Sequence, residues 1–118
     1  MNYGIAIHGG AGTILRSSMT AEKEERYTHA LQTALHIGYG ILEKQGSALD
    51  AVEAAVRSLE DCPLFNAGKG AVFNSEGKHE MDAAIMDGCE LRAGAVSLVQ
   101  NVKNPVSLAR KIMENTSH

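Results

Sequence analysis

The stretch HEMDAAIMDGCELRAGAVSLV, residues 79–99, decides the fold class. The Asp-Gly pair at 87–88 is a strong hairpin signal, so this stretch predicts two paired strands, over 79–86 and 90–99. In the second strand, alternate residues are expected to share one face: Leu91, Ala93, Ala95, Ser97 and Val99. The hairpin supplies the β part of a mixed fold.

Two helices are predicted on the N-terminal side of this stretch. Thr20 is a good N-cap residue with glutamates in the turn that follows, and the first helix is expected to run from it to Lys44. Gly46 is the expected C′ residue. Ser47 is the expected N-cap of the second helix, which ends at Pro63.

Three shorter elements complete the expected order. Residues 3–7 are apolar and lead into a glycine loop at 9–12, which predicts a buried strand followed by a tight turn. Residues 71–73 predict a strand before the hairpin. Asn104 and Pro105 predict the N-cap and first residue of a last helix. The order β, α, α, β, β, β, α is an α+β fold, and residues 1–118 form one domain or one piece of a domain.

Composition excludes several classes of protein. The 118 residues are 44% hydrophobic with a net charge of -3, which argues against disorder. No apolar run approaches the roughly 20 residues of a membrane helix, so no membrane partner is expected. The mild acidity argues against a nucleic-acid partner, which needs clustered Lys and Arg. Two cysteines are too few for a disulfide framework, so a cytoplasmic location is expected.

Residue patterns alone assemble no complete catalytic site. The glycine loop has the wrong spacing for dinucleotide binding, because Leu15 stands where the third glycine belongs. The histidines and cysteines have no zinc-site spacing, and no Gly-x-Ser-x-Gly nucleophile elbow is present. Glu60 and Asp61 stand at the end of the second helix, where acids oppose the helix dipole. Either a bound hard cation or simple solvation accounts for this pair.

Five ordered motifs carry a resemblance to a known family. They are His8-Gly9-Gly10-Ala11-Gly12, the run DCPLFNAGKGAVF at 61–73, the run MDAAIMDG at 81–88, Ala93-Gly94-Ala95-Val96 and Asn104-Pro105-Val106. Together they resemble the N-terminal portion of the plant-type asparaginase/isoaspartyl peptidase family of N-terminal-nucleophile hydrolases. The resemblance runs along the whole chain.

The resemblance implies both a fold and an activity. The fold would be part of an αββα sandwich, in a precursor that cuts itself into α and β subunits and assembles as (αβ)2. The nucleophile would be a threonine at the new N-terminus, with its own α-amino group as general base. It would hydrolyse L-asparagine and β-aspartyl dipeptides. Here the only Gly-Thr pair is Gly12-Thr13, in the glycine loop. The nucleophile is therefore expected in a β subunit outside residues 1–118, which alone would be inactive.

The resemblance also assigns site residues within this chain, and no organic cofactor. A sodium (or potassium) ion would bind main-chain carbonyls of Leu59, Glu60, Cys62, Phe65, Ala67 and Lys69. Asn66 would play an auxiliary part near the active site, and the loop with Gly9, Gly10 and Gly12 would lie near it and take part in self-cleavage. The alternative is a non-catalytic binding or assembly module that keeps half of the fold.

Overall fold

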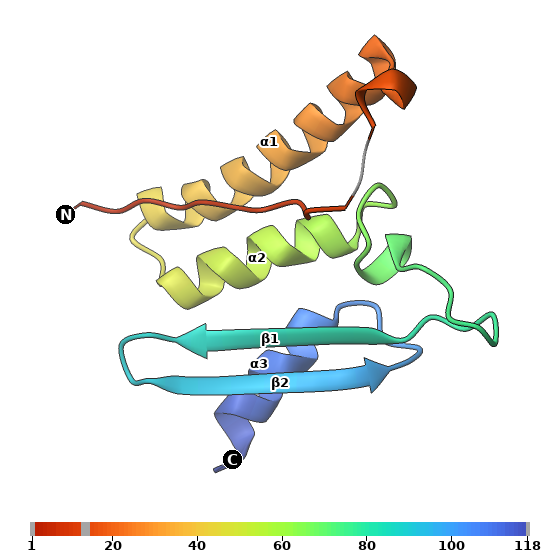
Figure 1. Ribbon diagram of the computed structural model, residues 1–118. Helices are drawn as coiled ribbons and strands as arrows, with labels where there is room; N and C mark the ends of the chain where they lie inside the picture. Colours follow the sequence, from red (N-terminus) through yellow and green to blue (C-terminus); the bar gives the residue numbers. More distant parts are fainter. Residues whose placement is uncertain (1, 13–14, 118) are drawn as a thin grey trace.

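The computed structural model describes residues 2–12 and 15–117 and shows a mixed α and β fold (Figure 1). In this part of the chain there are three helices, two strands and two short 3-10 turns. They are η1 (Arg16–Ser18), α1 (Ala21–Glu43), α2 (Ala48–Glu60), η2 (Gly68–Gly70), β1 (Met81–Asp87), β2 (Arg92–Val99) and α3 (Pro105–Asn115). Within the described residues, no helix combines the length and apolar character needed to cross a membrane.

The predicted hairpin is confirmed. Strands β1 and β2 pair antiparallel across the turn at 88–91, with Ala84 opposite Ala95 and Ile85 opposite Gly94. The register shifts between Met81 and Ala83, which marks a bulge. At this bulge the Asp82 carboxylate accepts hydrogen bonds from the Ser97 hydroxyl (3.0 Å) and the Leu98 amide (2.7 Å). Asp82 is thus a polar hairpin residue.

The predicted alternation of the second strand is confirmed for Ala93, Ala95 and Ser97, whose shared face points away from α3. Ala93, Ala95 and Ser97 are exposed, whereas Gly94 is buried and Val96 half-buried against α3. The reason is the close approach of the helix: a Cβ atom on Gly94 would overlap the carbonyl oxygen of Ala109. Only a strand with a glycine at this position lets α3 lie so near the sheet. The alternation is a local property of the strand, whereas the choice of the buried face is set by this contact.

The core is small and lies between the hairpin and α3. Its buried members are Ile85, Val106, Ala109 and Met113, with Leu49, Ala83 and Val96 packed around them. A second contact joins α1 to α2 through small residues, where a Cβ on Gly38 would overlap the Ile5 side chain and lie 3.1 Å from the Ala51 carbonyl oxygen. Helix α2 also contacts α3 and β1. It is therefore the central layer, with α1 on one side and α3 on the other.

Two predicted strands are absent from the described residues. Residues 3–7 form no strand and are not buried: their side chains are exposed or half-buried, although Ile5 reaches α1. In Figure 1 this segment runs across α1 and α2, apart from the hairpin. Residues 71–73 yield only one isolated bridge, between Phe73 and His79. A strand needs a partner ladder, and no described segment pairs along either stretch.

Helix boundaries agree with the local signals in most places. The Thr20 hydroxyl accepts from the Lys23 amide (3.1 Å) and the Ser47 hydroxyl from the Asp50 amide (3.0 Å), so both predicted N-caps are confirmed. The prediction for Gly46 is wrong, since the left-handed residue after α1 is Gln45, with φ 63. Gly46 instead donates its N–H to the Ile41 carbonyl (2.8 Å).

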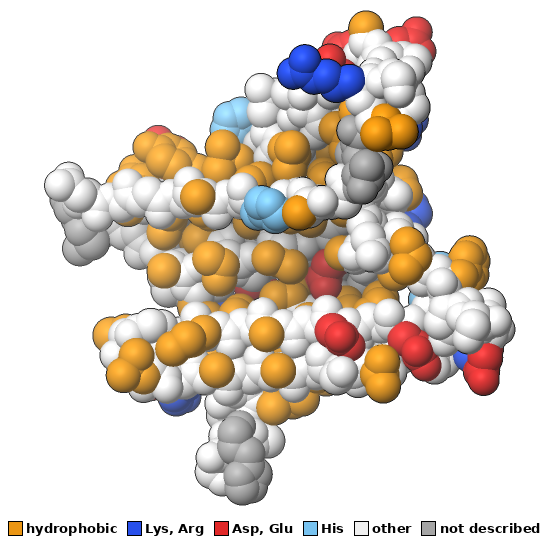
Figure 2. Space-filling view, viewed as in Figure 1, with side chains coloured by type: hydrophobic (Ala, Val, Ile, Leu, Met, Phe, Trp, Pro, Cys, Tyr) orange, Lys and Arg blue, Asp and Glu red, His pale blue; other side chains and the backbone are white. Residues whose placement is uncertain are grey.

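The hairpin face turned away from α3 is apolar and uncovered. Four exposed side chains on it form two cross-strand pairs, Ala84 with Ala95 and Met86 with Ala93. Figure 2 shows hydrophobic side chains gathered over this face and over the strip between the hairpin and the N-terminal segment. Contiguous apolar surface of this kind marks a place where another layer packs.

Candidate functional site

The candidate site consists of the end of α2 and the loop that follows it, residues 59–71, here called the carbonyl loop. It turns back on itself through short backbone hydrogen bonds, from the Cys62 amide to the Leu59 carbonyl (3.2 Å) and from the Ala67 amide to the Phe65 carbonyl (2.8 Å). Phe65 anchors the loop, because its side chain is buried and its ring meets the Tyr27 ring edge-on at 5.9 Å.

Two glycines let the backbone of the carbonyl loop close tightly. Gly68 has φ 51, and a Cβ on it would overlap the carbonyl oxygen of Glu60. A Cβ on Gly70 would overlap the Phe65 carbonyl oxygen and lie 2.6 Å from that of Pro63. A side chain at either position would therefore collide with carbonyl oxygens that the loop brings close to it.

This arrangement has the chemistry of a site for a hard cation. Carbonyl oxygens are the ligands that such ions take, and each carbonyl has two lone pairs. The Leu59, Phe65 and Ala67 carbonyls each accept one backbone hydrogen bond, which leaves a second lone pair for a ligand. Among the described residues, no three His, Cys, Asp or Glu side chains gather as metal ligands. The six-carbonyl ligand set stays a prediction.

Glu60 is the buried charge of the site, with only 3% of its surface exposed. Its carboxylate accepts hydrogen bonds from the Val106 amide (3.1 Å) and the Asn104 side-chain amide (3.4 Å). Burial raises the pKa of Glu60 above its usual range, although these two hydrogen bonds oppose the shift. The expectation of two solvated carboxylates is therefore wrong for Glu60.

Asn104 does not have the role that its position predicts. Its side chain makes no cap hydrogen bond to α3 and instead donates to the Asp61 carboxylate (2.9 Å) and to Glu60. Glu60 supplies the acceptor at this helix end. Sequence reasoning missed that role, since it joins residues 46 positions apart. The one signal was a last helix with no acidic residue in its first turn.

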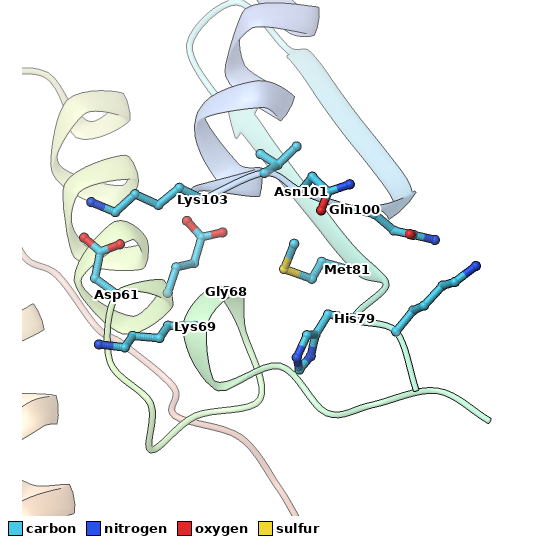
Figure 3. Close-up of a pocket in the computed structure, with 11 residues that line it drawn as sticks. Asp61, Gly68, Lys69, His79, Met81, Gln100, Asn101 and Lys103 are labelled. Atoms are coloured by element: carbon cyan, nitrogen blue, oxygen red, sulfur yellow. The ribbon is translucent and has the colours of Figure 1, made fainter. Parts of the chain in front are cut away.

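A pocket of about 740 Å³ opens beside the carbonyl loop, and its lining includes Glu60, Gly68 and residues 100–103 (Figure 3). Lys69 and Lys103 extend on the same side as Asp61, whereas His79 and Met81 lie at the opposite end. His79 stacks on Phe73 with ring centroids 4.1 Å apart, and its Nδ1 is buried without a hydrogen-bond partner. The side chains of Lys69 and Lys103, with those of Glu60 and Asp61, give the pocket charges of both signs.

Asn66 lies on the other side of the loop, with its side chain exposed. Its Oδ1 accepts a hydrogen bond from the Val72 amide (3.0 Å), which fixes the chain as it leaves η2. Asn66 also lines a second pocket, of about 390 Å³, together with Glu80, Asp82 and Leu98. The predicted auxiliary residue is thus held in place by the loop that contains it.

The glycine loop meets the carbonyl loop through one residue. A Cβ on Gly9 would lie 2.9 Å from the Leu31 side chain and 3.1 Å from the Phe65 ring. Gly10 has φ 118, and its amide donates to Nδ1 of the exposed His8 (3.2 Å). Nothing lies within 4 Å of a Cβ on Gly12. The structure thus brings Gly9 to the carbonyl loop, and Thr13 lies outside the described residues.

Comparison with known proteins gives a consistent result. The model of the asparaginase family matches residues 1–118. The chain is 54% identical to an isoaspartyl peptidase of Salmonella typhimurium over 97% of its length, and 52% identical to an isoaspartyl peptidase/L-asparaginase of Homo sapiens over all of it. A plant-type L-asparaginase of Pyrococcus horikoshii is 53% identical over 97% of the chain. The chain spans only 36–37% of the length of these relatives and corresponds to their N-terminal portion.

Proposed function

Because this chain belongs to the asparaginase family, we propose that it is the N-terminal part of a hydrolase that acts on L-asparagine and β-aspartyl dipeptides. One observation carries the proposal: over nearly its whole length the chain is more than 50% identical to relatives named isoaspartyl peptidase or L-asparaginase. Identity at this level indicates a shared fold.

The reaction needs a nucleophile from residues outside this chain. In the proposed enzyme, self-cleavage of a longer precursor frees a threonine whose hydroxyl attacks the β-carbonyl carbon of the substrate, with its α-amino group as base. The C–N bond breaks and ammonia or an amino acid leaves, and water then hydrolyses the resulting ester to release aspartate. The exposed apolar face of the hairpin supports a second β layer, supplied by the rest of the precursor to complete an αββα sandwich. The (αβ)2 assembly belongs to the same proposal.

The proposed enzyme holds a sodium or potassium ion in the carbonyl loop. The ligands are the main-chain carbonyls of Leu59, Glu60, Cys62, Phe65, Ala67 and Lys69, and the closure of the loop at Gly68 and Gly70 supports this assignment. When bound, such an ion would supply a positive charge that interacts favourably with the carbonyl oxygens of the loop. The ordered loop presents Asn66 to the reaction, while the contact between Gly9 and Phe65 holds the glycine loop beside it.

A cytoplasmic location is part of the proposal. Cys62 and Cys89 are free thiols, the former half-buried and the latter exposed. Free, accessible thiols are compatible with a reducing compartment.

Hydrolysis assays on the intact gene product test the function. We expect release of aspartate from L-asparagine and from a β-aspartyl dipeptide. We expect none from the matched α-aspartyl dipeptide, because its peptide bond is formed by the α-carboxyl group and not by the side-chain carboxyl group. Residues 1–118 expressed alone should release none from any of the three. Failure of the intact product on both substrates, with correct folding shown by circular dichroism, would contradict the proposal.

A further inference from the structure

Glu60 contacts two elements at once, one through its side chain and one through its main chain. The side chain ends at the N-terminus of α3, where the Val106 amide donates to it (3.1 Å). The main-chain carbonyl faces Gly68 in η2, in the carbonyl loop. No other residue of the proposed ligand set has a side chain that is both charged and buried.

The N-terminus of α3 depends on Glu60 for its cap. Helix N-termini leave amides without intrahelical partners, and they favour a negative charge. Asn104 stands at the N-cap position but makes no side-chain cap hydrogen bond, and the first turn contains no acidic residue. The Glu60 carboxylate supplies both the acceptor and the charge, from the far end of α2.

The same residue cannot move its carbonyl independently of its side chain. A Cβ on Gly68 would lie 2.7 Å from the Cβ of Glu60, so η2 packs directly on the start of this side chain. The carboxylate end is fixed by Val106 and Asn104, and the Cβ end by Gly68. With both ends held, the side chain links the N-terminus of α3 to the peptide that carries the Glu60 carbonyl.

We propose that Glu60 is a positioning residue whose carboxylate, held by α3, fixes the carbonyl loop in its cation-binding form. The proposal rests on the cation of the proposed function and extends it: α3 and the loop are coupled, so the cation stabilises the helix end and the capped helix favours the bound cation. Such coupling is reciprocal by thermodynamic necessity.

Thermal unfolding of the intact gene product tests this coupling. NaCl is titrated at constant ionic strength against choline chloride. The half-effective Na⁺ concentration, at which half of the folded protein holds the ion, is fitted for each variant from the logarithmic rise of Tm with Na⁺ concentration. Ligand binding to the native state alone raises Tm in this way. We expect Glu60→Ala to raise the half-effective Na⁺ concentration about tenfold or more, which corresponds to about 1.4 kcal/mol of coupling. Glu60→Gln, which keeps the shape and one acceptor, should lie between this variant and the wild type.

Glu53→Gln is the matched control. Glu53 also joins α2 to α3, since its carboxylate accepts from the Ser107 hydroxyl (2.7 Å) and contacts Arg110, but it lies outside the carbonyl loop. This variant should lower Tm without moving the half-effective Na⁺ concentration. If Glu60→Ala does not fold, Glu60→Gln against Glu53→Gln gives the same comparison.

The outcomes separate this proposal from the proposed function. Equal half-effective Na⁺ concentrations in Glu60→Gln, Glu60→Ala and wild type would overturn the positioning role, as would a wild type that Na⁺ does not stabilise beyond choline. Hydrolysis of L-asparagine by the wild type, measured in parallel, reports on the proposed function alone. A shifted Na⁺ response in a protein that hydrolyses neither substrate would uphold the coupling and overturn the enzyme.

Discussion

Gly94 is the residue at which the hairpin and α3 meet most closely. A Cβ there would overlap the Ala109 carbonyl oxygen and lie 2.7 Å from the Met113 amide nitrogen. Both are backbone atoms inside a helix, which cannot yield as a flexible side chain can.

Gly94→Ala is therefore expected to lower the free energy of unfolding by about 1–3 kcal/mol, through overpacking of the sheet against the helix. Urea unfolding of the intact gene product measures it. Gly88→Ala is the control, because nothing lies within 4 Å of a Cβ on Gly88. Equal midpoints for the two variants would show that α3 does not press on β2 at this point.

Prediction from sequence at the residue scale works where the interaction is local. Thr20 and Ser47 were identified as N-caps because their partners lie three residues away. Gly46 was not identified correctly, since the chain uses Gln45 in the left-handed conformation. Glu60 could not be assigned to α3, because nothing near it in sequence indicates that its partner is Val106.

At the scale of elements, the hydroxyl of Ser47 fixes the start of α2. Ser47→Ala removes the acceptor of the Asp50 amide and should cost about 1 kcal/mol of stability. Ser75→Ala, at an exposed turn position, is the matched control and should change little. Chemical denaturation of both variants decides the matter, and a Ser47→Ala protein as stable as the control would refute the cap.

The charged contact between α2 and α3 makes stability depend on pH. Arg110 pairs with Asp50 (2.6 Å), Glu53 (2.5 Å) and, within α3, Glu114 (2.8 Å). The hydrogen bond from Arg110 lowers the pKa of Asp50. Burial alone would raise the pKa of Glu53, but hydrogen bonds from Ser107 and Arg110 outweigh it and lower that pKa. Carboxyls with a lowered folded-state pKa stabilise the fold above their unfolded pKa and lose this effect as pH falls through the folded pKa.

Arg110→Gln should therefore lower the free energy of unfolding by about 1 kcal/mol at neutral pH, a modest figure because Asp50 and Glu114 are solvent-exposed. The difference from wild type should shrink as pH falls below about 4, where the carboxyls become protonated. Measuring the free energy of unfolding of both proteins between neutral and acidic pH checks this prediction. A difference that stays constant down to low pH would assign the effect of Arg110 to packing alone.

Element types followed from the sequence better than their contacts did. The three helices and the hairpin were predicted, because their periodicity and turn residues are local signals. The strands expected at 3–7 and 71–73 did not form, and which face of β2 is buried was not predicted. Both points depend on long-range partners: a ladder that no described segment supplies, and the approach of α3 to Gly94.

At the scale of the whole molecule, the uncovered face of the hairpin is the main feature. The exposed pairs Ala84–Ala95 and Met86–Ala93 form an apolar surface, and residues 3–7 lie extended without a ladder partner. Residues 1–118 expressed alone should therefore aggregate, dimerise through this face or bind the rest of the precursor. Light scattering coupled to gel filtration measures this. A monodisperse monomer that melts cooperatively would contradict it.

The candidate site was located from sequence chiefly through the family resemblance. Glu60 and Asp61 indicated a cation or solvated acids on physical grounds, and motif similarity then pointed to the carbonyl loop. The ligands are main-chain oxygens, which leave no pattern of His, Cys, Asp or Glu for sequence analysis to find. Besides this acidic pair, the glycines at 68 and 70, which let the loop close, are a second physical signal in the sequence.

Intact-mass spectrometry of the gene product, with N-terminal sequencing of each polypeptide, tests the central claim most directly. The account predicts two polypeptides from one precursor: one that contains the sequence of residues 1–118, and a second that begins with threonine. A fully active preparation that contains only the uncleaved chain, or a gene product with no residues beyond His118, would contradict it.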